Sequence, residues 1–166
     1  MAVTTRTQTL IFDTPKEAVL RMLTDASFYQ RKYEALGLQD ISVQPTTHDN
    51  APFAVLARFK AHTELPLPGW AKRVLPDTIG VEQMDYWSID SARGGLQIHL
   101  QGTPVRISAD MGLSEEGDKV INTVQWRFDC PVPLVGKKLA EFVADDVCTK
   151  AERDHGFGRT QAERYR

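Results

Sequence analysis

The sequence lacks the patterns that would mark a metal, redox or membrane protein. It contains only two cysteines, Cys130 and Cys148, and they match no metal-binding or redox spacing. No uninterrupted apolar run is long enough to span a bilayer, and the first residues do not resemble a secretory signal. We therefore expect a cytoplasmic protein with two reduced thiols and no stable membrane insertion.

Charge and glycine patterns exclude further classes of function. The 20 basic and 22 acidic residues give a net charge of -2, and the basic residues are dispersed, so we expect no nucleic-acid partner. The histidines show no ligand spacing with a carboxylate, and there is no G-x-S-x-G elbow or glycine-rich phosphate loop. We therefore expect no metal, no cofactor and no catalytic nucleophile.

What the sequence does contain is a strand followed by a long helix near its carboxyl-terminal end. In residues 119–130, Val124, Trp126 and Phe128 share one parity and polar residues share the other, which is typical of a strand with one dry face. Two prolines end this strand. Apolar residues then recur at helical spacing over residues 134–153, so we expect this helix to lie across the dry face of the sheet.

The amino-terminal part predicts a strand and two short helices. Residues 5–12 alternate as a strand, and Asp13 or Thr14 is placed to cap the helix that begins beside Pro15. The second helix carries aromatic residues on its apolar side and stops at Gly37.

From residue 38 onward the pattern changes to a period of two. We expect a hairpin of strands 38–47 and 52–63 with a turn at His48-Asp49-Asn50, then a proline-rich flap at 64–76. Four more strands are expected at 79–90, 96–101, 105–114 and 120–130. The connections at 92–95, 102–104 and 115–118 have turn chemistry, so neighbouring strands should be antiparallel.

Together these elements predict an α+β fold in a single domain over residues 1–166. A curved antiparallel sheet of about seven strands would wrap around the long carboxyl-terminal helix, with two short helices after the first strand. The hydrophobic content of 42% suffices to bury one sheet face and its covering helix. Because Gly156 and Gly158 lie among polar residues, we expect the helix to weaken there and a mobile tail from about residue 156.

Two segments resemble a known superfamily. Residues 13–33, DTPKEAVLRMLTDASFYQRKY, resemble the entry pattern of the START-like or helix-grip superfamily, which includes Bet v 1-type proteins and polyketide cyclases. Residues 131–147, PVPLVGKKLAEFVADDV, are similar to the entry into its closing helix. With residues 102–113, GTPVRISADMGL, they look closest to an uncharacterised bacterial branch known as a domain of unknown function. The resemblance implies a helix-grip fold with an apolar ligand between the sheet and the closing helix.

The dry parity of the strands predicts the wall of a cavity. Aromatic residues converge there, while the small side chains of Ala57, Ala61 and Ala109 leave space, which favours a hollow over a filled core. The few polar residues on this face could orient a ligand's hydroxyl, carbonyl or amine, or lie at the sheet ends in contact with water. The candidate ligand-binding residues are Phe59, Gln83, Asp85, Trp87, Ile98, Ile107, Met111, Asn122, Trp126, Phe128, Leu139 and Phe142.

Four further residues each allow two interpretations. Asp25, and the pair Asp145 and Asp146 on the closing helix, could take part in acid–base chemistry, although a cap and a solvated face are commoner uses of such charges. Trp70 could cover a cavity mouth or touch a membrane surface, or it could pack beneath its own loop.

The function predicted from these residues is binding, transport or sequestration of a hydrophobic small molecule such as a fatty acid, isoprenoid or polyketide, without catalysis. Entry would pass the flap at 66–76 and the helices at 15–36. Two alternatives stay open. In a polyketide cyclase/aromatase-like or dehydratase-like enzyme, Asp85, Gln83 or Asn122 would polarise a bound carbonyl group. In a protein-interaction module, the core would be filled and a surface patch would bind the partner.

Overall fold

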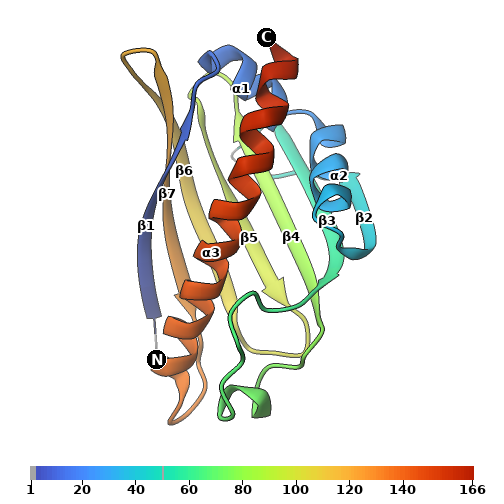
Figure 1. Ribbon diagram of the computed structural model, residues 1–166, viewed down its shortest axis with the longest axis vertical. Coiled ribbons are helices and arrows are strands. Elements are labelled where there is room, and N and C mark those ends of the chain that lie inside the picture. Colours follow the sequence, from blue (N-terminus) through green and yellow to red (C-terminus); the bar gives the residue numbers. More distant parts are fainter. Residues whose placement is uncertain (1–2, 50) are drawn as a thin grey trace.

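The computed structural model describes residues 3–49 and 51–166 as a curved sheet that grips a long helix (Figure 1). The strands are β1 (Val3–Phe12), β2 (Gln39–Pro45), β3 (Phe53–Ala61), β4 (Ile79–Ser88), β5 (Arg93–Leu100), β6 (Arg106–Glu116) and β7 (Lys119–Asp129). Their spatial order is β1-β7-β6-β5-β4-β3-β2, and all neighbours are antiparallel. The predicted architecture is confirmed.

The helices lie on the inner face of the sheet (Figure 1). The long helix is α3 (Gly136–Ala162), the two short ones are α1 (Lys16–Leu23) and α2 (Ala26–Ala35), and the 3-10 turns are η1 (Ala71–Arg73) and η2 (Glu163–Tyr165). Gly37, with a φ of 70°, ends α2 as predicted, because glycine reverses the chain there without strain. In the predicted turn between β2 and β3, Asn50 lies outside the described residues. Within the described residues, no helix combines the length and apolarity needed to cross a membrane.

The alternation of the strands sorts side chains onto two faces as predicted. Ile98 of β5 lies in register between Gln83 of β4 and Ile107 of β6, and Phe128 of β7 lies beside Ile107. Buried residues of this inner face form one hydrophobic cluster with the helices. The opposite parity, which includes the exposed Gln97, faces water.

Two glycines lie inside β5, which corrects the turn predicted at residues 92–95. Gly94 pairs with Trp87 of β4, and Gly95 pairs with Tyr86. A Cβ atom at Gly94 would clash with the Tyr86 carbonyl oxygen and would lie 2.6 Å from Cδ2 of the Trp87 indole. Glycine fits this position because the neighbouring backbone and an aromatic ring leave no room for a side chain, and the Tyr86 ring has the same effect at Gly95.

Replacing Gly94 with alanine should lower the free energy of unfolding by about 1–3 kcal/mol, the usual effect of overpacking, because the added methyl group clashes with the Tyr86 carbonyl and the Trp87 indole. Gly69→Ala is the matched control, since a Cβ atom there meets nothing within 4 Å. Urea denaturation compares the two variants. Equal stability would show that the indole is not held against Gly94.

The carboxyl-terminal end of α3 does not weaken at the two glycines, so that prediction is wrong for the helix. The helix continues to Ala162, and η2 follows directly. The Tyr165 hydroxyl donates to Asp25 Oδ2 at 2.6 Å and accepts from Arg31 at 2.6 Å. Asp25 also caps α2 as predicted, because its Oδ1 accepts from the Ser27 N–H at 3.0 Å. These hydrogen bonds fix the end of the chain and offset the conformational freedom that the two glycines add to the helix.

The same anchoring explains why the predicted cap of α1 is absent. Thr14 Oγ1 donates to Glu163 at 2.6 Å, and Asp13 pairs with Arg159 at 2.9 Å. Pro15 occupies the N-cap position, and no side chain caps the helix. Both candidate capping side chains are used to hold the end of the chain instead.

The connector between β3 and β4 is irregular as predicted, and it is tied to α3. The Trp70 ring meets the Phe142 ring edge to face, with 6.5 Å between centroids. Asp146 is buried, and its Oδ1 accepts from the backbone N–H groups of Glu64 at 2.6 Å and Leu65 at 2.9 Å. The solvated-face interpretation of Asp146 is therefore wrong, because this carboxylate satisfies two backbone donors of the connector.

Candidate functional site

A cavity of about 340 Å³ lies between the inner face of the sheet and the helices α2 and α3. This volume is at the lower end of the range of roughly 300–1,000 Å³ that small-molecule sites occupy. Most of the wall is aromatic or aliphatic, and it comes from β1, the three helices and strands β3 to β7. Nine of the predicted site residues line it: Phe59, Gln83, Asp85, Trp87, Ile98, Ile107, Met111, Asn122 and Trp126.

Three predicted site residues lie elsewhere, around the beginning of α3. Phe128 is fully buried and stacks on Trp126, with 5.7 Å between ring centroids. Leu139 is also fully buried, and Phe142 contacts Trp70 of the connector. These side chains fill the fold at this end and do not line the cavity.

The mouth of the cavity is marked by the lining residues that are exposed to solvent. Gly37 lies in the turn after α2, His62 and Glu64 lie in the connector, and Arg153 lies on α3. Arg153 forms an ion pair with Glu64 across this opening. The connector therefore borders the cavity through His62 and Glu64, the first residue of the expected flap at 64–76, and residues 66–76 do not line it.

The polar groups of the inner wall gather around Asp85 on β4. Asp85 is only 6% exposed, and Gln83 Nε2 donates to its Oδ1 at 2.9 Å. Among the described residues, no donor is bonded to the other carboxyl oxygen, Oδ2. Lys32 of α2 lines the same cavity, yet within the described chain it forms no ion pair with Asp85.

Lys32 was missed as a candidate site residue. Its ammonium group lies 5.8, 5.2 and 4.9 Å from the ring centroids of Phe28, Tyr29 and Tyr33, within the range of cation–π attraction. The signal was its spacing: Lys32 follows Phe28 by four residues and precedes Leu36 by four. This spacing places a lysine within the apolar side of the helix.

Burial shifts the pKa values of ionisable side chains in the cavity wall. It raises the pKa of the Asp85 carboxyl, while the charge of Lys32 and the hydrogen bond from Gln83 oppose that rise. Burial also raises the pKa of the Tyr33 hydroxyl well above its ordinary value, and the nearby charge of Asp85 adds to this. The Tyr33 hydroxyl and Asn122 Oδ1 are buried without a hydrogen-bond partner in the described structure. Unused buried polar atoms are uncommon in folded proteins, and here they belong to residues of the cavity wall.

Asp85→Asn should stabilise the protein at neutral pH and lose this advantage in acid. The folded-state pKa of Asp85 is raised, so as the pH rises this carboxyl loses its proton in the unfolded chain before it does so in the folded protein. The free energy of unfolding of the wild-type protein therefore falls as the pH rises from the ordinary pKa of 3.8 to the raised pKa. Asparagine keeps the acceptor for Gln83 and carries no charge. Urea denaturation across acidic and neutral pH tests this, with the exposed Asp110→Asn as control. A variant less stable than wild type at neutral pH would contradict it.

Other reactive side chains are poorly placed for chemistry. Both cysteines are free, and burial raises the pKa of Cys130 to about 11, so little nucleophilic thiolate is present at neutral pH. His155 lines the cavity, but its Nε2–H donates to the Ile11 carbonyl at 2.7 Å, and burial lowers its pKa. In the part of the chain that the structure describes, no three potential metal ligands come together.

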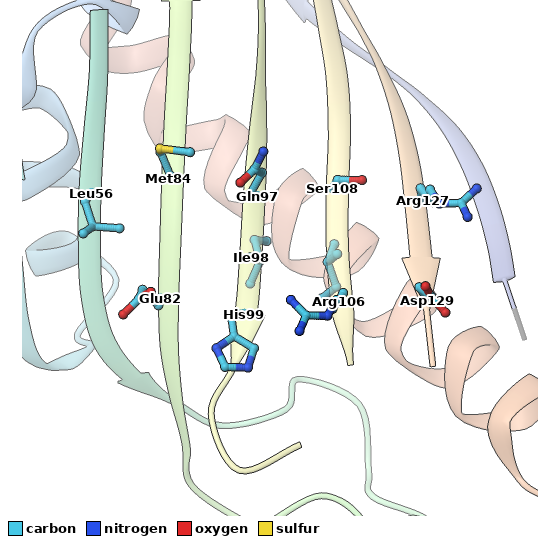
Figure 2. Close-up of a pocket in the computed structure, with 11 residues that line it drawn as sticks. Leu56, Glu82, Met84, Gln97, Ile98, His99, Arg106, Ser108, Arg127 and Asp129 are labelled. Carbon is cyan, nitrogen blue, oxygen red and sulfur yellow. The ribbon is translucent and has the colours of Figure 1, made fainter. Parts of the chain in front are cut away.

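A second depression, of about 490 Å³, lies on the outer face of the sheet. Figure 2 shows its side chains on β3 to β7, with α3 behind the sheet. Gln97, His99, Arg106 and Arg127 are exposed there. Because these groups stay hydrated, the depression offers little enclosed apolar surface, and the inner cavity is the stronger candidate site.

Solved structures of the same architecture share little sequence with this chain. Zhui aromatase/cyclase from Streptomyces sp. R1128 gives a TM-score of 0.66 at 11% identity, over 98% of this chain and 94% of that one. Ara h 8.0201 gives 0.62 at 13% identity, over 97% and 98% of the two chains. A START superfamily protein from Mycobacterium smegmatis gives 0.57 at 10% identity, over 95% and 98%. These likenesses show a common fold.

Sequence comparison identifies the family directly. No curated protein matches the sequence. One family model, described as protein of unknown function (DUF2505), matches residues 7–160, from within β1 to near the end of α3. The fold is that of the START superfamily and Bet v 1-like proteins, as the sequence resemblance implied. Since the matched residues span most of the sheet and almost all of α3, the chain belongs to the DUF2505 family.

Proposed function

We propose that the protein binds a hydrophobic or amphipathic small molecule in the inner cavity without converting it. The observation that carries this proposal is the cavity of about 340 Å³, whose wall is mostly aromatic and aliphatic. Atoms that line an empty apolar space lack the dispersion contacts of a filled core, and an apolar ligand restores them. A fatty acid, an isoprenoid or a polyketide fragment would suit such a wall.

The comparisons support this proposal only through the fold. A START superfamily protein and a protein named as an aromatase/cyclase share the sheet-and-helix arrangement that encloses the cavity. Since one fold can serve several functions, the site itself must decide between them. The hollow interior argues against the interaction module, which required a filled core.

Filling the cavity should abolish binding. Ile98→Trp adds bulk at the centre of the inner wall, and we expect it to weaken binding of N-phenyl-1-naphthylamine, a neutral apolar fluorescent probe, at least roughly tenfold. Met84→Trp is the matched control because Met84 lies on the outer face of the neighbouring strand. Fluorescence titration measures the affinity, and circular dichroism checks that each variant is folded. Equal affinity of folded Ile98→Trp and wild type would rule out the cavity as the binding site.

A second candidate is an enzyme in which Asp85 transfers a proton to or from a bound carbonyl compound. Two observations favour it: the carboxyl is buried in the cavity wall, and its pKa is raised by that burial. A buried carboxyl group with a raised pKa is a candidate general acid for cyclisation or dehydration of a polyketide.

The enzyme hypothesis predicts turnover that depends on the Asp85 carboxyl. Wild-type protein should cyclise or dehydrate a poly-β-ketone thioester, and Asp85→Asn should bind the same compound but lose activity by roughly a hundredfold or more. Mass spectrometry of the product mixture measures the reaction. Binding of the thioester without any product from wild-type protein would favour the binding function.

A further inference from the structure

The charged residues that line the cavity fall into two groups. At the mouth they are paired: Arg153 with Glu64, and Lys150 with the buried Asp146 at 3.1 Å. Inside, the ammonium group of Lys32 lies near three aromatic rings, and among the described residues the Asp85 carboxyl accepts a hydrogen bond from Gln83 alone. The inner wall thus presents a cation and a carboxyl group that act on each other electrostatically but do not touch.

We propose that the cavity selects a ligand with a hydroxyl head, an alcohol or a phenol, held between the Lys32 ammonium and Asp85 Oδ2. This inference rests on the proposed binding function and adds the chemical class of the ligand. A hydroxyl oxygen accepts from Lys32 while its hydrogen is donated to Asp85, so one small group satisfies both residues. The apolar body then lies against Trp87, Ile98 and the strands beyond.

Charged heads fit this site less well. An ammonium head would be attracted by Asp85 but repelled by Lys32, and a carboxylate head would be attracted by Lys32 but repelled by Asp85. For either head the two interactions oppose each other, while the cost of removing its charge from water remains. A hydroxyl group avoids both conflicts. Tyr33, whose hydroxyl is buried without a partner in the described structure, is next to Lys32 in the sequence and lines the same cavity.

The test compares ligands that share one chain and differ in the head. The probes are 1-decanol, decyl methyl ether, decanoate and decylamine, titrated at neutral pH while the intrinsic tryptophan fluorescence is followed, because Trp87 and Trp126 line the cavity. We expect 1-decanol to bind roughly tenfold or more tightly than the ether, which keeps the acceptor but lacks the donor. Both charged probes should bind more weakly than 1-decanol.

Two variants assign the selectivity to the two residues. Lys32→Met removes the cation, so 1-decanol should bind more weakly and decylamine more tightly. Asp85→Asn removes the carboxylate, so 1-decanol should again lose affinity while decanoate gains. Lys60→Met is the control, because Lys60 is an exposed lysine of β3 paired with Asp40 and lies outside the cavity. It should leave all four affinities unchanged.

Failure of this inference differs from failure of the proposed function. If no probe binds wild-type protein, binding in the cavity is itself wrong. If the four probes bind equally, or a charged probe binds tightest, the protein binds apolar chains but the hydroxyl selectivity is wrong. An unchanged order of affinities in both Lys32→Met and Asp85→Asn would likewise overturn it.

Discussion

The structure depends on one constraint: a broad curved sheet is covered by a single long helix. Among the strands, α3 makes most of its close backbone contacts with β1, and it runs obliquely over the rest of the sheet (Figure 1). The inner faces of β4, β5 and β6 therefore lie farther from α3, and the cavity occupies part of the space between them. Of the three alanines predicted to leave space, Ala61 of β3 lines the cavity, whereas Ala57 and Ala109 are buried and do not line it.

A helix that packs over a hollow needs anchors beyond the apolar contact. Tyr165, just after α3, is bonded to Asp25 and Arg31 of the α2 region, and Asp146 within α3 accepts two backbone hydrogen bonds from the connector. The closing helix is thus held at two positions by polar contacts that do not require a filled interior. The second anchor also fixes the connector residues beside Glu64, so the position of α3 and the shape of the cavity mouth are coupled.

Strand alternation could be predicted from the sequence more fully than tertiary contacts could. Period-two parity placed Trp87, Ile107 and Trp126 on the inner face correctly, because each strand has one buried face. It misassigned Gly94 and Gly95 to a turn, since their reason for being glycine is an aromatic ring on the neighbouring strand. It left Lys32 without a role, because composition assigns lysine to water, although its helical spacing put it on the apolar side. The position of the chain end could not be predicted in the same way. It depends on the hydrogen bonds and ion pair of Asp13, Thr14 and Tyr165, whose partners lie more than a hundred residues away in the sequence.

Two features of the inner wall lower stability at the same place. A packing argument alone would favour a larger residue at Ala61, which leaves the cavity unfilled, and an apolar residue at Asp85, since burial of that carboxyl favours its neutral form. Either feature by itself would be an ordinary imperfection of a core. Here both features occur in one cavity, which Lys32 lines from α2 and whose mouth is bordered by paired charges. A small amphipathic molecule would fill the apolar space and form hydrogen bonds with the polar groups at the same time.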